Sequence, residues 1–139
     1  MFKEKTFTIP ELKGISIKNI EEHLKLYAGY VKHSNLILDH INELSKDSEK
    51  NAYELGELQR RFSFEFDGMR NHEYYFSSLE NGPRSLEDTS PLKSAIEKEW
   101  GSFDVWLARF KSIAMTRGVG WAMLYYDKSS GHLLNAWVE

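Results

Sequence analysis

Between residues 52 and 79 the apolar side chains recur with the period of an α-helix, and this pattern constrains the fold more than any other stretch. They stand in steps of three, four and seven residues, at Leu55, Leu58, Phe62, Phe66, Met69, Phe76 and Leu79. Such steps place side chains on one face of a helix with about 3.6 residues per turn. His72 completes the series, so we expect its imidazole to point into the core.

Gly68 lies on the same face, one turn before His72. Glycine inside a helix costs roughly 1 kcal/mol relative to alanine. We therefore expect another group to approach the backbone closely at Gly68. For His72 the residues leave two interpretations open. It is either a core histidine that bonds to a carbonyl group, or a metal ligand with partners elsewhere in the chain.

A second long helix is predicted to begin at Ser16 or Asn19 and to end near Leu44. Its apolar side comprises Ile20, His23, Tyr27, Tyr30, Val31, Leu38 and Ile41. The polar residues 45–51 form a connection of the length that joins antiparallel helices. The first half of the chain is therefore predicted to be a helical hairpin.

Residues 1–15 contain a proline and a glycine and are predicted to be extended rather than helical. A loop rich in glycine, proline and serine follows the second long helix, and it is the one plausible boundary between domains. We accordingly expect a helical hairpin domain at residues 1–82 and a partial α/β domain at residues 83–139.

The second half is predicted to contain short helices at residues 92–100 and 103–116, followed by strands at residues 121–126 and 132–138 joined by a polar turn. The inward side of the second short helix is expected to carry Phe103, Trp106, Leu107, Phe110 and Ala114. The fold class is thus α+β and mostly α, with a C-terminal antiparallel β-hairpin. An isolated β-hairpin has free edges that favour further pairing, so we expect a homo-oligomer or a complementing chain.

Composition excludes several classes of function. The chain has no cysteine, which rules out disulfides, thiolate metal sites and cysteine nucleophiles. The net charge of −3 and the lack of a basic cluster argue against nucleic acid as a partner. No signal peptide and no run of membrane-spanning length is present. We expect a cytoplasmic protein without a membrane partner.

Four features together resemble the iron/manganese superoxide dismutases, in the order in which that family has them. They are residues 71–76, residues 101–106, residues 118–124, and His23 followed by Tyr30. The resemblance covers nearly the whole chain. It implies the dismutation of superoxide to oxygen and hydrogen peroxide at one iron or manganese ion.

The resemblance also implies roles for individual residues. His23 and His72 correspond to metal ligands, Tyr30 to a proton-relaying tyrosine, and Trp121 to a tryptophan that shields the metal pocket. His23 and Tyr30 are one residue closer together than in the family's usual pattern, which leaves Glu22 as an alternative at the first ligand position. We favour His23, because two helical turns place it on the same face as Tyr30.

Other departures bear on function. Leu26 stands where the family often has a pocket histidine. Gly68 stands where iron-type members carry a glutamine, which resembles the manganese-type arrangement. The family's Asp-x-Trp-Glu-His segment, which supplies its other two ligands, is absent from these residues. The implied site is therefore incomplete, and we expect either ligands from another polypeptide or region, or no bound metal.

Two hypotheses for function follow: a superoxide dismutase whose missing ligands are supplied elsewhere, and a non-catalytic scaffold or interaction protein that has lost the metal site. The remaining histidines, His33, His40 and His132, are expected at the surface. Asp67 and Glu73 adjoin the His72 face but are predicted to point into solvent.

Overall fold

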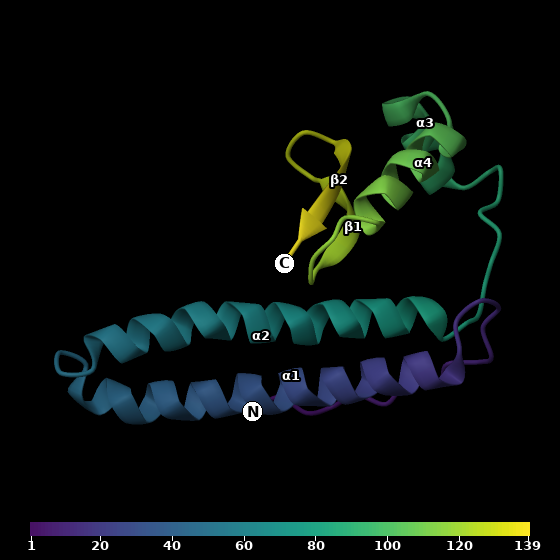
Figure 1. Cartoon of the computed structure of the whole chain (residues 1–139). Coiled ribbons are helices and arrows are strands. Elements are labelled where there is room, and N and C mark those ends of the chain that lie inside the picture. The colour runs from purple at the N-terminus through teal and green to yellow at the C-terminus, as the bar shows by residue number, and fades with distance from the viewer. The chain divides into compact units, whose positions relative to one another are not determined.

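The structure is a computed structural model that describes all 139 residues. The chain forms two compact units, Met1–Pro83 and Arg84–Glu139. In the first unit, helices α1 (Ile17–Leu44) and α2 (Ala52–Leu79) run antiparallel and side by side (Figure 1). A short 3₁₀ turn, Ser45–Asp47, lies in the connection between them. The predicted helical hairpin is confirmed.

Helix α1 begins where a serine side chain satisfies its first turn. The Ser16 hydroxyl accepts a hydrogen bond from the Asn19 amide at 3.1 Å, which is the usual role of serine at a helix N-cap. Of the two predicted starts, the structure has the one at Ser16. The buried side chains of α1 are Ile20, Tyr27, Val31, Ser34 and Ile37.

Helix α2 buries its apolar side against α1. Tyr27 and Val31 of α1 join Met69 and Phe76 of α2 in the core cluster of the hairpin. Met69 and Phe76 are fully inaccessible to solvent, in keeping with the periodicity of the sequence. Since this core runs along the contact between the two helices, residues on their facing sides are held in fixed positions.

Residues 1–9, which we call the N-terminal arm, contain no helix or strand, as predicted. The arm is not solvated like a free tail, however. Its Phe2, Phe7 and Ile9 pack against the core cluster of the hairpin. A tight turn follows, in which Leu12 and Ile15 form an isolated bridge around Gly14, whose φ is 87°.

The second unit contains helices α3 (Pro91–Trp100) and α4 (Phe103–Ala114) and strands β1 (Trp121–Asp127) and β2 (His132–Val138). The strands pair antiparallel over their whole length, and Trp121 lies opposite Val138. This confirms the predicted α+β class with a C-terminal β-hairpin. None of the helices in either unit has the length and apolar character needed to span a membrane.

Helix α4 packs on one face of the sheet. The Trp106 indole donates a hydrogen bond to Asn135 Oδ1 of β2 at 3.0 Å, and Leu133 of the same strand is buried. Ala114 was expected on the inward side of α4, but this prediction is wrong. It is exposed because it is the last residue of the helix, beyond its packed turns.

Candidate metal centre

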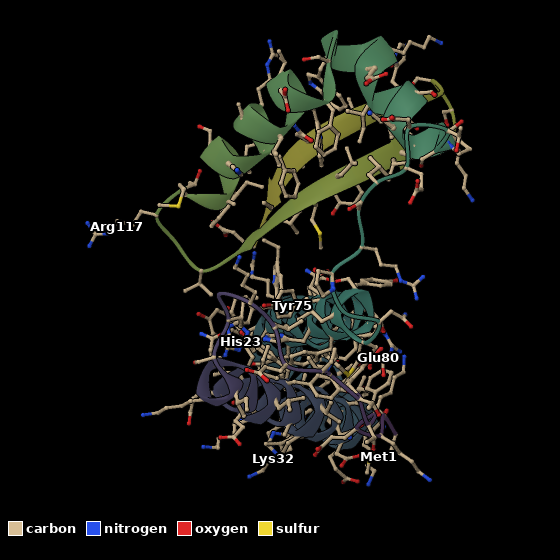
Figure 2. The ribbon with its side chains drawn as sticks, turned by 90° about the vertical axis from the view of Figure 1, so that its right-hand side faces the viewer. Met1, His23, Lys32, Tyr75, Glu80 and Arg117 are labelled. Carbon is tan, nitrogen blue, oxygen red and sulfur yellow. The ribbon has the colours of Figure 1, made fainter.

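The hairpin places His23 of α1 and His72 of α2 next to each other, with ring centroids 5.7 Å apart. Figure 2 marks His23 on the side of α1 that faces α2, whereas Lys32 points away from α2. Bonds from a metal ion to imidazole nitrogen are about 2.1 Å long, so two rings that share an ion have centroids at most about 6.5 Å apart. The two rings are therefore close enough to share one ion.

A backbone hydrogen bond orients the ring of His72. Its Nδ1 lies 2.7 Å from the carbonyl oxygen of Gly68. Because a carbonyl only accepts, Nδ1 carries the proton, and the neutral ring has its lone pair on Nε2. Such a bond on one nitrogen commonly orients a histidine that binds metal through the other. The bond to a carbonyl group expected for a core histidine is thus present, and the role of His72 as a metal ligand stays a prediction.

The surroundings of His72 favour its neutral form. Burial is the main effect and lowers the pKa of His72, the bond to Gly68 opposes it, and the neighbouring His23 lowers it again. A histidine must be neutral to bind a metal ion. The buried ring is therefore available for coordination without first losing a proton at neutral pH.

His23 has an unsatisfied atom at this site. Its Nδ1 is buried and has no hydrogen-bond partner, a condition that is costly for a polar group and needs an explanation. A bound cation is one explanation that suits imidazole chemistry. Glu22, the alternative at this ligand position, is exposed and pairs with Lys25 at 2.7 Å. The geometry places His23, and not Glu22, opposite His72.

Tyr30 lies against both His72 and Gly68. The ring centroids of Tyr30 and His72 are 5.3 Å apart. A Cβ atom at Gly68 would stand 2.6 Å from Tyr30 Cδ1 and 2.8 Å from Tyr30 Cζ, which is closer than side-chain carbons approach. The close contact expected at Gly68 is confirmed, and the contacting group is the ring of Tyr30.

The Tyr30 hydroxyl keeps its proton at neutral pH. Burial raises the pKa of Tyr30, the carboxylate of Glu65 raises it further, and Arg61 opposes them. The phenol can therefore donate a proton or a hydrogen bond to a group beside His72. Tyr75, whose ring lies 5.7 Å from that of His23, was not predicted from the sequence to belong to this site. Its place one turn after His72 is the signal that could have found it.

No group of three or more histidine, cysteine, aspartate or glutamate side chains is arranged to hold a metal ion. Trp121 begins β1 in the second unit, where it is half-buried, and its shielding role stays a prediction. His33 and His40 are exposed, as expected. His132 is exposed too and contacts Glu99 at 2.8 Å.

The prediction that Glu73 is solvated is wrong, although Asp67 is exposed as expected. Glu73 is only 5% exposed. Its carboxylate accepts hydrogen bonds from Tyr27 Oη at 3.1 Å, Lys5 Nζ at 2.6 Å and Arg70 Nη1 at 2.8 Å. These partners compensate the charge, which allows it to be buried beside the core.

Comparison with known proteins gives matches in both units. Residues 88–139 match the family described as iron/manganese superoxide dismutases, C-terminal domain. An iron superoxide dismutase of Cupriavidus metallidurans is 36% identical over 132 residues, covering 93% of this chain and 65% of that protein.

Two further relatives give similar results. An iron superoxide dismutase of Sulfolobus acidocaldarius is 33% identical, covering 81% of this chain and 55% of that protein. A mitochondrial manganese superoxide dismutase of Glossina morsitans morsitans is 30% identical, covering 84% and 54%. The chain thus spans between about half and two thirds of the length of these relatives.

Proposed function

Since this chain is a relative of the iron/manganese superoxide dismutases, we propose that His23 and His72 are two of the ligands of an iron or manganese ion that dismutates superoxide. The observation that carries the proposal is the pairing of two imidazoles across the hairpin, one with an unsatisfied buried nitrogen. The names of the relatives support iron or manganese without deciding between them.

The imidazoles of His23 and His72 are nitrogen donors of the kind that iron and manganese accept, and the ion needs further ligands besides these two side chains. When bound, the ion supplies the one-electron chemistry by which two superoxide ions and two protons give oxygen and hydrogen peroxide. The chain's own residues bind and orient. Gly68 fixes the ring of His72 through its carbonyl, and the protonated phenol of Tyr30 holds a proton beside that ring.

Metal binding tests the ligand assignment directly. We would titrate the metal-free chain with Mn²⁺ and compare the wild type with His23→Ala and His72→Ala. Each substitution should weaken binding by at least about tenfold, since even partners of a ligand commonly contribute that much. His33→Ala is the matched control, because His33 is an exposed histidine on the same helix as His23. Equal Mn²⁺ affinity in all the variants would contradict the assignment.

The second candidate function is a scaffold or interaction protein without catalysis. The observation that favours it is the lack of a third metal-binding side chain near the two histidines. Superoxide dismutase activity of the 139-residue chain, measured with saturating Fe²⁺ or Mn²⁺, would exclude this second candidate. We expect the chain alone to have little or no activity, because two imidazoles hold a divalent ion weakly. Rapid turnover with one bound metal per chain would contradict that expectation.

We also propose that the second unit associates with another polypeptide, either a second copy or a complementing chain. The support is the two-stranded sheet, whose outer backbone edges have no strand beside them in this chain. On the face away from Leu133, Tyr125 and Leu134 lie opposite each other and are both exposed. A cytoplasmic location stays a prediction.

A further inference from the structure

The N-terminal arm is held to the helical hairpin by side chains that bond to its backbone. The side-chain amide of Asn35 accepts from the Phe2 amide at 2.7 Å and donates to the Phe2 carbonyl at 2.9 Å. The hydroxyl of Tyr27 accepts from the Lys5 amide at 2.9 Å, and Glu80 accepts from the Thr8 amide at 3.0 Å. Hydrogen bonds to the helices therefore recur along the whole arm.

Two aromatic side chains of the arm add apolar contacts. Phe2 lies 5.7 Å from Phe66, and Phe7 lies 5.1 Å from Phe76, between ring centroids. Phe7 also meets the ring of Tyr27 at 5.9 Å. The arm contributes these rings without any helix or strand of its own, so its position depends on the contacts it makes with α1 and α2.

One buried carboxylate joins the arm to both helices. Glu73 of α2 pairs with the Lys5 ammonium and accepts from the Tyr27 hydroxyl, which itself accepts from the Lys5 amide. Arg70, the other partner of Glu73, also lies over the ring of Phe2 at 5.4 Å. Removing this one carboxylate would therefore affect both the charged and the backbone contacts of Lys5.

The arm is also linked to His72 of the candidate metal centre, through the ring of Phe76. Phe76 is fully buried, and its ring touches Phe7 of the arm and, at 5.8 Å, the ring of His72. If the arm detached from the hairpin, the ring of Phe76, which packs against His72, would lose its contact with Phe7. The arm and the histidine are thus linked through a single aromatic ring.

We propose that the N-terminal arm is a strap that binds to and detaches from the hairpin as a unit, with Glu73 as its anchor, and that its attachment supports His72. The turn at Leu12–Ile15 is the hinge, since Gly14 has a φ of 87° and no atom within 4 Å of its Cβ position. The link to metal retention rests on the proposed function, whereas the attachment itself does not.

Hydrogen exchange of the metal-free chain tests the attachment. Both Glu73→Gln and Lys5→Met remove the ion pair between the Lys5 ammonium and the Glu73 carboxylate. The arm should then detach more often, so the amides of Lys5 and Thr8 should exchange roughly tenfold faster or more. Amides in the middle of α1 and α2 should keep their wild-type rates. Glu65→Gln is the matched control. Glu65 is equally buried on α2, but its ion pair is with Arg61 of the same helix and not with a residue of the arm.

Lys5→Met keeps the test decisive if Glu73→Gln fails to fold, because the Lys5 side chain is 58% exposed and its loss leaves Glu73 paired with Arg70. Wild-type exchange rates at Lys5 and Thr8 in the variant would overturn the proposal. So would arm amides that exchange in the wild type only when the whole hairpin unfolds.

Mn²⁺ tests the link to His72. Attachment and metal binding should favour each other by the same factor, so Mn²⁺ should slow exchange in the arm, and Lys5→Met should weaken Mn²⁺ binding several-fold. If the wild type binds Mn²⁺ and Lys5→Met binds it equally well, the link to His72 is overturned. If the wild type binds no Mn²⁺, the proposed function fails, and the exchange of the metal-free chain still decides whether the strap exists.

Discussion

Gly68→Ala should destabilise the hairpin even though alanine is the better helix former. Alanine gains roughly 1 kcal/mol over glycine inside a helix. Against this, the new Cβ would stand 2.6 Å from Tyr30 Cδ1. The rigid Tyr30 ring has little room to yield, since it packs against His72 on one side and Phe64 on another. Overpacking of this kind costs about 1 to 3 kcal/mol.

We expect the clash to outweigh the helical gain by up to about 2 kcal/mol, since the full ring and not a flexible side-chain end is in the way. For a unit of this size, that loss lowers the midpoint of thermal unfolding by roughly 4 to 8 °C per kcal/mol. Far-ultraviolet circular dichroism measures it, because α1 and α2 hold most of the helical residues.

Gly56→Ala is the matched control for this substitution. Gly56 lies in α2 as well, but no atom stands within 4 Å of its Cβ position. Alanine there should stabilise the chain by up to about 1 kcal/mol. In a Tyr30→Ala background the penalty of Gly68→Ala should vanish, because the obstructing ring is gone. The reasoning is refuted if Gly68→Ala and Gly56→Ala both stabilise the wild-type chain.

Three further predictions concern pH, helix capping and association. Burial raises the pKa of Glu73, but hydrogen bonds from Lys5, Arg70 and Tyr27 outweigh it and hold the pKa below its ordinary value of 4.5. The ionised carboxylate then contributes stability that is complete above that value and is lost as the pH falls through the lower folded pKa. In urea titrations, Glu73→Gln should be destabilised by about 1 to 3 kcal/mol near pH 6 and by progressively less as the pH falls below 4.5; a gap that stays constant with pH would contradict this. Ser102→Ala should cost about 1 kcal/mol, because the Ser102 hydroxyl caps α4. Ser90→Ala should cost little, since Ser90 makes no such bond to α3, and equal losses would argue against capping. Sedimentation at micromolar concentration should show a dimer of the pure chain or, if it is monomeric, unprotected amides along β2; a monomer whose β2 is fully protected would contradict the proposed association.

The long helices could be predicted because their signals are local. The apolar series from Leu55 to Leu79 and the polar residues on either side fix α2 within a residue or two, and the structure has the same bounds. The β-hairpin could be predicted for the same reason, because a polar turn ending at Gly131 separates two apolar runs. In each case the residues that decide the structure are neighbours in the sequence.

The contacts of Glu73 could not be predicted in this way. One of its partners, Lys5, lies 68 positions away, in an arm whose path over the hairpin leaves no periodic trace in the sequence. Without that path, a glutamate next to His72 reads as a surface charge. The pairing of His23 with His72 was easier to predict from the sequence, because both residues lie on apolar helix faces. The unsatisfied nitrogen of His23 could not be predicted, because it depends on packing that only the structure shows.

The division of the chain into two units also divides its chromophores. All four tryptophans, Trp100, Trp106, Trp121 and Trp137, belong to the second unit, while the hairpin contains only tyrosine and phenylalanine rings. Indole fluorescence therefore reports on the α/β unit alone, and the helical signal reports mainly on the hairpin. Transitions that coincide by both probes would mean that the units unfold as one cooperative system, and separate transitions would mean that each unit is stable by itself. The natural tryptophans of the wild-type chain can thus report, without an added label, whether the two units unfold together.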